Sequence, residues 1–108
     1  MTEEELIESI KKCDFVITNP THFAVVIKAD KQNQCFILLA KGEDERAQQI
    51  KKIAISAQKL VVESPEDARA IFREFNEGDS FDKYNSALID IMEKNSGLLK
   101  PEVFIEFK

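Results

Sequence analysis

Three short runs of β-branched and aromatic residues near the start of the chain constrain its fold more than any other feature. They are Phe15–Thr18, Phe23–Lys28 and Cys35–Ala40. Runs of this kind predict strands, because such side chains pack well on a pleated surface. Only short polar segments separate the runs, so we expect the strands to be neighbours in one sheet. The third run is apolar throughout, which predicts burial on both of its faces.

Helices and a fourth strand follow these runs. Ser64 as a cap and Pro65 at the first helical position mark one helix start, and amphipathic spacing indicates the others. The order predicts a small single-domain α/β sandwich, with a four-stranded mixed sheet surrounded by helices. In the tail, Val103–Phe107 alternates weakly and predicts either an extra edge strand or a flexible end. The other expected elements are helices over residues 2–12, Asp44–Gln58, Pro65 toward Gly78, and Phe81–Lys94, and a strand over Leu60–Glu63.

Charge and composition exclude several classes of function. The 108 residues are enough for one domain. Asp and Glu number 20 against 15 Lys and Arg, a net charge of −5, so we expect no nucleic-acid partner. No apolar run approaches the roughly 20 residues of a membrane span, so we expect no span of its own. Cys13 and Cys35 are interpreted as reduced thiols, and with His22 as the single histidine no metal or cofactor is expected.

The segment Asn19-Pro20-Thr21-His22 is the strongest candidate for chemistry. Pro20 has no N–H, so the usual reaction, in which the next backbone nitrogen attacks the asparagine side chain, cannot take place. The Asn19 side-chain amide can instead attack its own backbone carbonyl, form a succinimide and expel the proline nitrogen. A folded turn accelerates such a step by holding the atoms together. Thr21 and His22 are placed to stabilise the oxyanion or relay the proton.

Two other interpretations remain open at this point. Asn19-Pro20 is also typical of an ordinary turn between strands, with a solvent-facing His22. Lys41-Gly42 before a helix is a weak pattern for a phosphate-binding turn, because a single glycine is followed by three acids. The residues alone favour neither self-cleavage nor phosphate handling over a plain turn.

Three blocks in order resemble one known family. They are Cys13–Lys28 around the Asn-Pro-Thr-His motif, Ala40–Ala54, and Pro65–Gly78. Together they resemble the self-cleavage region of the FlhB/YscU family, the substrate-specificity switch proteins of flagellar and type III export machines. The resemblance covers about residues 13–94, which it identifies as a switch domain between a helix at 1–12 and a tail at 95–108.

The resemblance implies a fold and a function that agree with the residues. It implies a four-stranded sheet with helices, the motif in the loop between the first two strands, and autocleavage between Asn19 and Pro20. Asn19 is then the cyclising residue, Pro20 the leaving group, and Thr21 and His22 shape the loop or relay a proton. The implied partners are other export-apparatus proteins and export substrates, and the implied location is cytoplasmic, at the cytoplasmic face of a membrane export gate.

The chain also departs from the family pattern. The membrane domain and the basic linker helix are absent from it, and the acidic stretch TEEELIESIKK stands in the linker's place. After Gly78 the segment Asp79–Tyr84 is short and lacks the expected proline. We therefore expect a stand-alone paralogue in preference to an excised domain. A non-cleaving adaptor that only docks export partners is the alternative function.

Overall fold

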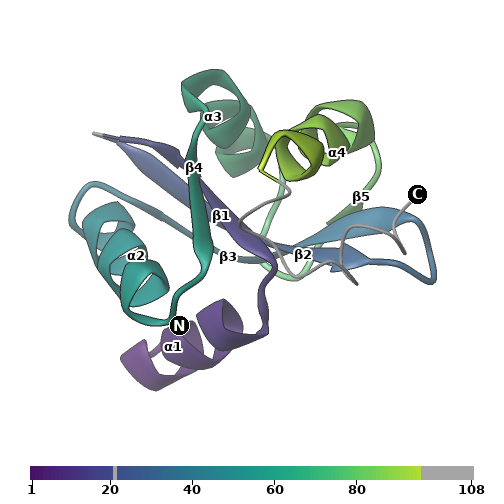
Figure 1. Cartoon of the computed structure of the whole chain (residues 1–108). Coiled ribbons are helices and arrows are strands. Elements are labelled where there is room, and N and C mark those ends of the chain that lie inside the picture. The colour runs from purple at the N-terminus through teal and green to yellow at the C-terminus, as the bar shows by residue number, and fades with distance from the viewer. Residues whose placement is uncertain (21, 96–108) are drawn as a thin grey trace.

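A five-stranded mixed sheet forms the centre of the molecule (Figure 1). The computed structural model describes residues 1–20 and 22–95. The strands lie in the order β4-β1-β2-β3-β5, with β1 and β4 parallel and the other neighbours antiparallel. The elements are α1 (Glu3–Lys12), β1 (Phe15–Asn19), β2 (Phe23–Asp30), β3 (Cys35–Glu43), α2 (Glu45–Ser56), β4 (Leu60–Glu63), α3 (Pro65–Glu74), β5 (Ser80–Phe81) and α4 (Asn85–Lys94).

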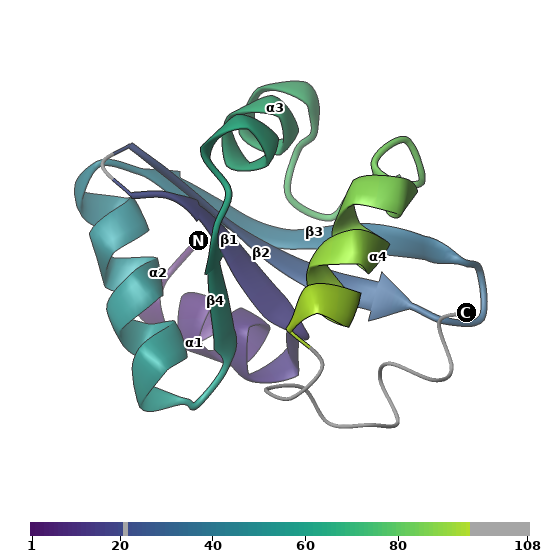
Figure 2. The same cartoon turned by 45° about the horizontal axis from the view of Figure 1, so that its top comes forward.

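Helices cover both faces of the sheet and make two separate cores. α1 and α2 lie on one face, and α3 and α4 lie on the other (Figure 2). Alternate strand residues feed the two cores, so Val16 faces α1 and α2 while Ile17 faces α3 and α4. The predicted α/β sandwich is confirmed, with one strand more than expected.

The acidic helix α1 belongs to the packed structure. Thr2 caps it in a complete capping box, because its side chain accepts from the Glu5 N–H and the Glu5 carboxylate accepts from the Thr2 N–H. Leu6 and Ile10 are fully buried against α2 and the sheet. This packing stabilises a ten-residue helix that would be marginal by itself.

The prediction that the third strand is buried on both faces is wrong in detail. In β3, buried and half-buried residues alternate. A bulge opposite Val26 and Ile27 leaves Leu39 without a partner in the β2–β3 pairing. On the two sides of the bulge, Leu38 faces the α3–α4 core and Ala40 faces the α1–α2 core. The sequence is therefore apolar without a break because the buried residues of β3 switch from one face of the sheet to the other at the bulge.

The predicted capping of α3 is only partly right. Pro65 does occupy the first turn, and Ser64 is the cap residue. The Ser64 hydroxyl, however, donates to the Asp67 carboxylate at 2.7 Å and does not accept a backbone N–H. The pair of side chains therefore takes the place of the expected cap on a backbone N–H.

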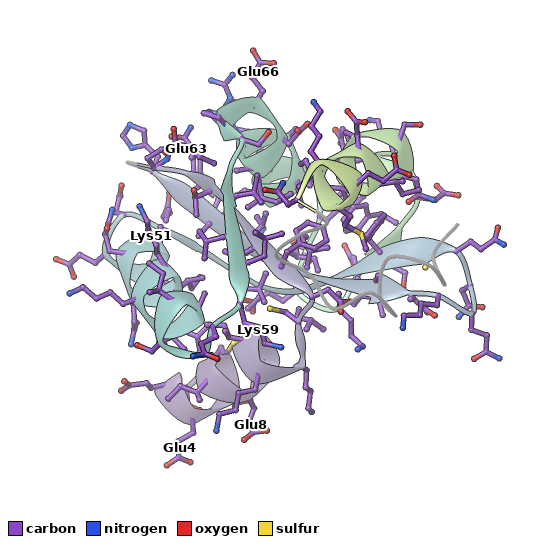
Figure 3. The ribbon with its side chains drawn as sticks, in the orientation of Figure 1. Glu4, Glu8, Lys51, Lys59, Glu63 and Glu66 are labelled. Carbon is purple, nitrogen blue, oxygen red and sulfur yellow. The ribbon has the colours of Figure 1, made fainter. Side chains whose placement is uncertain are left out.

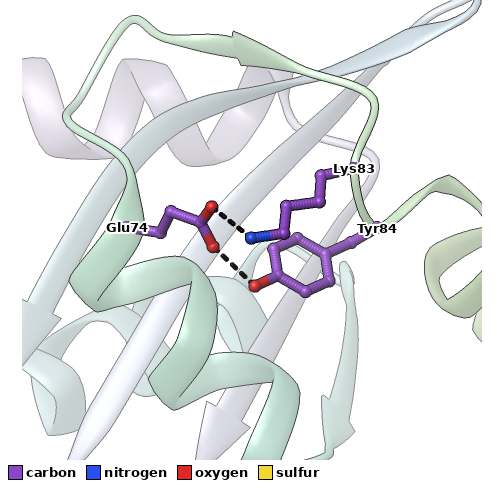
Figure 4. Close-up of polar contacts among 3 residues, drawn as sticks. All are labelled: Glu74, Lys83 and Tyr84. Atoms are coloured by element: carbon purple, nitrogen blue, oxygen red, sulfur yellow. Dashed lines mark hydrogen bonds and ion pairs between the residues drawn. The ribbon is translucent and has the colours of Figure 1, made fainter.

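The last helix starts four residues later than predicted. Phe81 belongs to β5, where it pairs with Phe36 of β3 and stacks on Phe75 at 4.3 Å between ring centroids. After β5, Lys83 Nζ and the Tyr84 hydroxyl both donate to the Glu74 carboxylate, at 2.7 and 2.6 Å (Figure 4). These contacts tie the approach to α4 onto the end of α3. A helical pattern in the sequence cannot show such cross-strand pairing.

Candidate functional site

The Asn-Pro motif forms the tight connection between β1 and β2. Asn19 is the last residue of β1 and pairs with Phe23, the first residue of β2. The His22 N–H donates to the Asn19 carbonyl oxygen at 3.0 Å, which closes a turn over Pro20. A donor on this oxygen polarises the carbonyl that joins Asn19 to Pro20. The turn therefore presents the Asn19 carbonyl to a hydrogen-bond donor.

The first turn of α2 holds the motif from the side. The Asp44 N–H donates to the His22 carbonyl at 2.9 Å, and the Gln48 side-chain amide donates to the Pro20 carbonyl at 3.2 Å. Asp44 has a positive φ of 52°, a conformation that an L residue adopts at some cost. This local strain is tolerated where α2 starts beside the turn.

The side chains at the turn are open to water. His22 Nδ1 lies 3.7 Å from Asp44 Oδ1, with the two side chains 63% and 73% exposed. An ion pair this exposed contributes little to stability. The Asp44 carboxylate can still orient the imidazole, which remains in contact with solvent.

The frame behind the turn is rigid. β1 lies between β4 and β2, and Thr18, just before the motif, is buried. The Ser64 N–H donates to the Thr18 carbonyl, and the Phe23 ring packs on Phe72 at 4.6 Å between centroids. Both sides of the turn are therefore fixed by elements that are distant in the sequence.

The structure brings together three of the four predicted site residues, Asn19, Pro20 and His22. Thr21 lies outside the described residues. Asp44 and Gln48 were missed by the sequence reasoning. Asp44 at the cap position of α2 and Gln48 four residues later in its first turns lie at the start of a predicted helix, and this placement is the signal that could have indicated them.

The phosphate-turn interpretation of Lys41-Gly42 is wrong. Both residues lie inside β3, so they form no loop. Lys41 Nζ donates to the Phe72 and Phe75 carbonyls at 2.8 and 2.9 Å and lies over the Phe72 ring. A Cβ at Gly42 would collide with the Arg46 side chain, so close packing against α2 explains the glycine. The amine is already engaged at the end of α3.

Neither cysteine has the properties of a reactive thiol. Cys13 and Cys35 are free. Burial raises the pKa of Cys13 to about 12 and also raises that of Cys35, and the thiol form is the less nucleophilic one. Within residues 1–20 and 22–95, no three His, Cys, Asp or Glu side chains gather in a way that could hold a metal ion. Over the same residues, no helix is long and apolar enough to span a bilayer.

Solved structures define the class of this domain. The chain matches the cytoplasmic domain of FlhB from Shewanella putrefaciens with a TM-score of 0.78 at 23% identity, over 87% of this chain and 79% of that one. It also matches a mutated EscU C-terminal domain with a TM-score of 0.69 at 24% identity, over 89% and 91% of the two chains. The class is the small α/β domain that these two proteins share.

Sequence comparison identifies the family. The model of the FlhB HrpN YscU SpaS family matches residues 1–84, and the chain belongs to this family. The flagellar biosynthetic protein FlhB of Helicobacter pylori (strain ATCC 700392 / 26695) is 36% identical over 70 residues, 65% of this chain and 20% of that protein. FlhB of Bacillus subtilis is 36% identical over 73 residues, 67% and 20% of the two. The chain thus spans about a fifth of these relatives, and the predicted resemblance is confirmed.

Proposed function

We propose that this chain is a cytoplasmic component of a flagellar or type III protein export apparatus. It cuts itself between Asn19 and Pro20 and takes part in switching the class of exported substrate. Residues 13–94 are the switch domain, and its partners are other export-apparatus proteins and export substrates. The observation that supports the cleavage most directly is the hydrogen bond from the His22 N–H to the Asn19 carbonyl oxygen. Membership of a family with flagellar biosynthetic relatives supports the role in protein export.

The proposed reaction is a single intramolecular cyclisation. The Asn19 side-chain nitrogen attacks the backbone carbonyl carbon of the same residue and forms a tetrahedral intermediate. Its negative oxygen is the atom that accepts the His22 N–H. The bond from this carbon to the Pro20 nitrogen then breaks, and that nitrogen takes up a proton. The piece 1–19 ends in a succinimide, which water opens.

The surrounding groups have supporting roles in this reaction. Gln48 holds the Pro20 carbonyl, which positions the leaving segment against the attacking amide. The His22 imidazole, oriented by Asp44, relays the proton from the attacking nitrogen toward the leaving one. No step requires a metal or an external nucleophile other than water.

The two pieces stay associated after the cut. β1 keeps its pairing with β2 and β4, and Phe15, Val16 and Ile17 are fully buried in the two cores. Burial on this scale resists withdrawal of the strand. Cleavage therefore frees the ends of the turn without unfolding the domain, and the freed loop changes the surface that export partners meet.

Intact-mass analysis under denaturing conditions tests the cut. We expect the purified wild-type chain to appear as residues 1–19 and 20–108. Asn19→Ala should abolish cleavage, because alanine cannot cyclise. Pro20→Ala should slow or stop it by changing the turn and the leaving group, and His22→Ala should only slow it, because water partly replaces the relay.

Asn33→Ala is the matched control. Asn33 also lies in an exposed turn, where its side chain bonds Asp30, and its loss should leave the cut unchanged. A folded wild-type chain that stays whole for days would contradict self-processing and favour the adaptor function. Equal cleavage in Asn19→Ala would instead assign the cut to an outside protease.

A further inference from the structure

The side chain of Asn19 lies on the face of the sheet that α3 and α4 cover. Successive residues of a strand point to opposite faces. Ile17, two residues earlier in β1, belongs to the α3–α4 core, whereas Val16 belongs to the α1–α2 core. Asn19 is still within β1 and is in register with Phe23 of β2. The amide that attacks in the proposed reaction is therefore on the α3 side of the motif turn.

The contacts from α2 reach the turn from the other side. Asp44 and Gln48 bond the backbone of the motif from the start of α2, a helix that packs in the α1–α2 core. Figure 3 shows Lys51 on α2 and Glu66 on α3 on the two sides of Glu63, which pairs with β1 just before the motif. α2 thus holds the segment that leaves, and a group that orients the attacking amide must belong to the α3 side.

Phe23 is the residue directly opposite Asn19 in the β1–β2 pairing. Side chains that face one another in an antiparallel pair lie on the same face of the sheet, with Cβ atoms about 4.5–5.5 Å apart. The Phe23 ring therefore lies beside the Asn19 side chain and fills space through which the amide would otherwise turn. A ring that is itself fixed can hold the Asn19 amide close to one direction of attack.

The end of α3 fixes the Phe23 ring. Phe23 packs on Phe72, with the ring centroids 4.6 Å apart. The Lys41 ammonium group lies over the other ring of this pair, 4.7 Å from the centroid of Phe72. The same group donates to the Phe72 and Phe75 carbonyls at the C-terminal end of α3, where backbone carbonyls lack helical partners. Lys41 therefore ties the end of α3 to β3 and keeps Phe72 against Phe23.

We propose that Phe23 is a positioning residue for self-cleavage, and that Phe72 and Lys41 act through it. The Phe23 ring restricts the Asn19 side chain to rotamers in which its nitrogen faces the carbonyl carbon of the same residue. Phe72 and Lys41 supply the rigidity that makes this restriction effective. The inference rests on the proposed cleavage and names the groups that set its rate.

Cleavage rates per folded molecule test the proposal. They come from time courses of intact mass after refolding of the full chain, corrected for the fraction folded. Phe23→Ala should slow cleavage about tenfold, because a misplaced nucleophile loses the advantage of proximity, and Phe72→Ala should have a similar effect. Phe75→Ala is the matched control. It removes a ring from the end of the same helix that stacks on Phe81, so the rate per folded molecule should stay unchanged.

Two further comparisons separate positioning from general stability. The double variant Phe23→Ala with Phe72→Ala should cleave no more slowly than Phe23→Ala alone, because Phe72 acts through Phe23. Lys41→Met should slow cleavage severalfold, and Lys41→Arg, which keeps a donor for the same carbonyls, should restore most of the rate. Equal rates per folded molecule in the wild type, Phe23→Ala and Phe72→Ala would overturn the proposal. Full additivity of the two substitutions would overturn it as well.

The rotamer of Asn19 gives a test that does not depend on cleavage. In uncleaved Pro20→Ala, three-bond couplings of the Asn19 β-protons should report one dominant χ1 rotamer. Addition of Phe23→Ala should average these couplings over several rotamers, whereas addition of Phe75→Ala should not. Couplings that are averaged even with Phe23 in place would contradict the positioning role. A wild-type chain that never cuts itself, with a single Asn19 rotamer, would contradict the proposed function but not the placement of Asn19 by Phe23.

Discussion

The motif turn and the aromatic cluster of Phe36, Phe75, Phe81 and Tyr84 are held together by different forces. Backbone hydrogen bonds hold the turn, and its His22 side chain is 63% exposed. Ring packing holds the cluster, in which Phe36 is fully buried. Changes at the turn should therefore alter chemistry with little effect on stability, and changes in the cluster should do the reverse.

Among the substitutions that test this comparison, Phe81→Ala should have the largest effect on stability. Phe81 is 5% exposed and contacts three other aromatic rings. Its loss leaves a cavity and should lower the free energy of unfolding by about 3–5 kcal/mol. Chemical denaturation measures this change, and Phe81→Leu, which fills part of the space, should lose much less. The rate of self-cleavage per folded molecule should equal that of the wild type. A slower rate per folded molecule would show that the aromatic cluster and the motif turn are energetically coupled.

An intermediate effect is expected from Gln48→Ala at the turn. The substitution removes the hydrogen bond from the Gln48 amide to the Pro20 carbonyl. It should slow cleavage severalfold, because a hydrogen bond contributes a net of about 1 kcal/mol. The melting temperature should stay close to that of the wild type. Time courses of intact mass measure the rate. Gln49→Ala, the neighbouring control, removes a side chain that bonds Arg46 and should leave the rate unchanged.

The smallest effect is expected from Lys83→Met at the border of the cluster. Lys83 lowers the pKa of Glu74 below its ordinary 4.5, through a hydrogen bond that Tyr84 reinforces. A carboxyl whose pKa is lowered on folding stabilises the fold above its unfolded pKa, and this contribution is lost as the pH falls through the folded value. The variant should melt slightly lower than the wild type near neutral pH, and the difference should shrink at acid pH. A difference that grows toward acid pH would contradict this pairing.

The main strands could be predicted because their signals are local. Val25 and Val26 belong to a run whose residue types favour strand by themselves, and β1, β2 and β4 lie where the runs predicted. β5 was missed because its two residues become a strand only by pairing with Phe36 and Ile37, far away in the sequence. The change of face in β3 also depends on a bulge opposite another strand, which a run of apolar letters does not show.

The chemistry that we propose for the motif could be formulated from the sequence for a similar reason. The attacking nitrogen and the carbonyl belong to Asn19, and the leaving nitrogen belongs to the next residue, so covalent connectivity alone brings them together. What surrounds them was decided by the tertiary structure. Asp44 and Gln48 reach the turn only because α2 packs over the end of β1 and β2, a contact between segments more than 20 residues apart. Local sequence determines which bond the proposed reaction would break, whereas long-range packing determines which groups hold that bond in place.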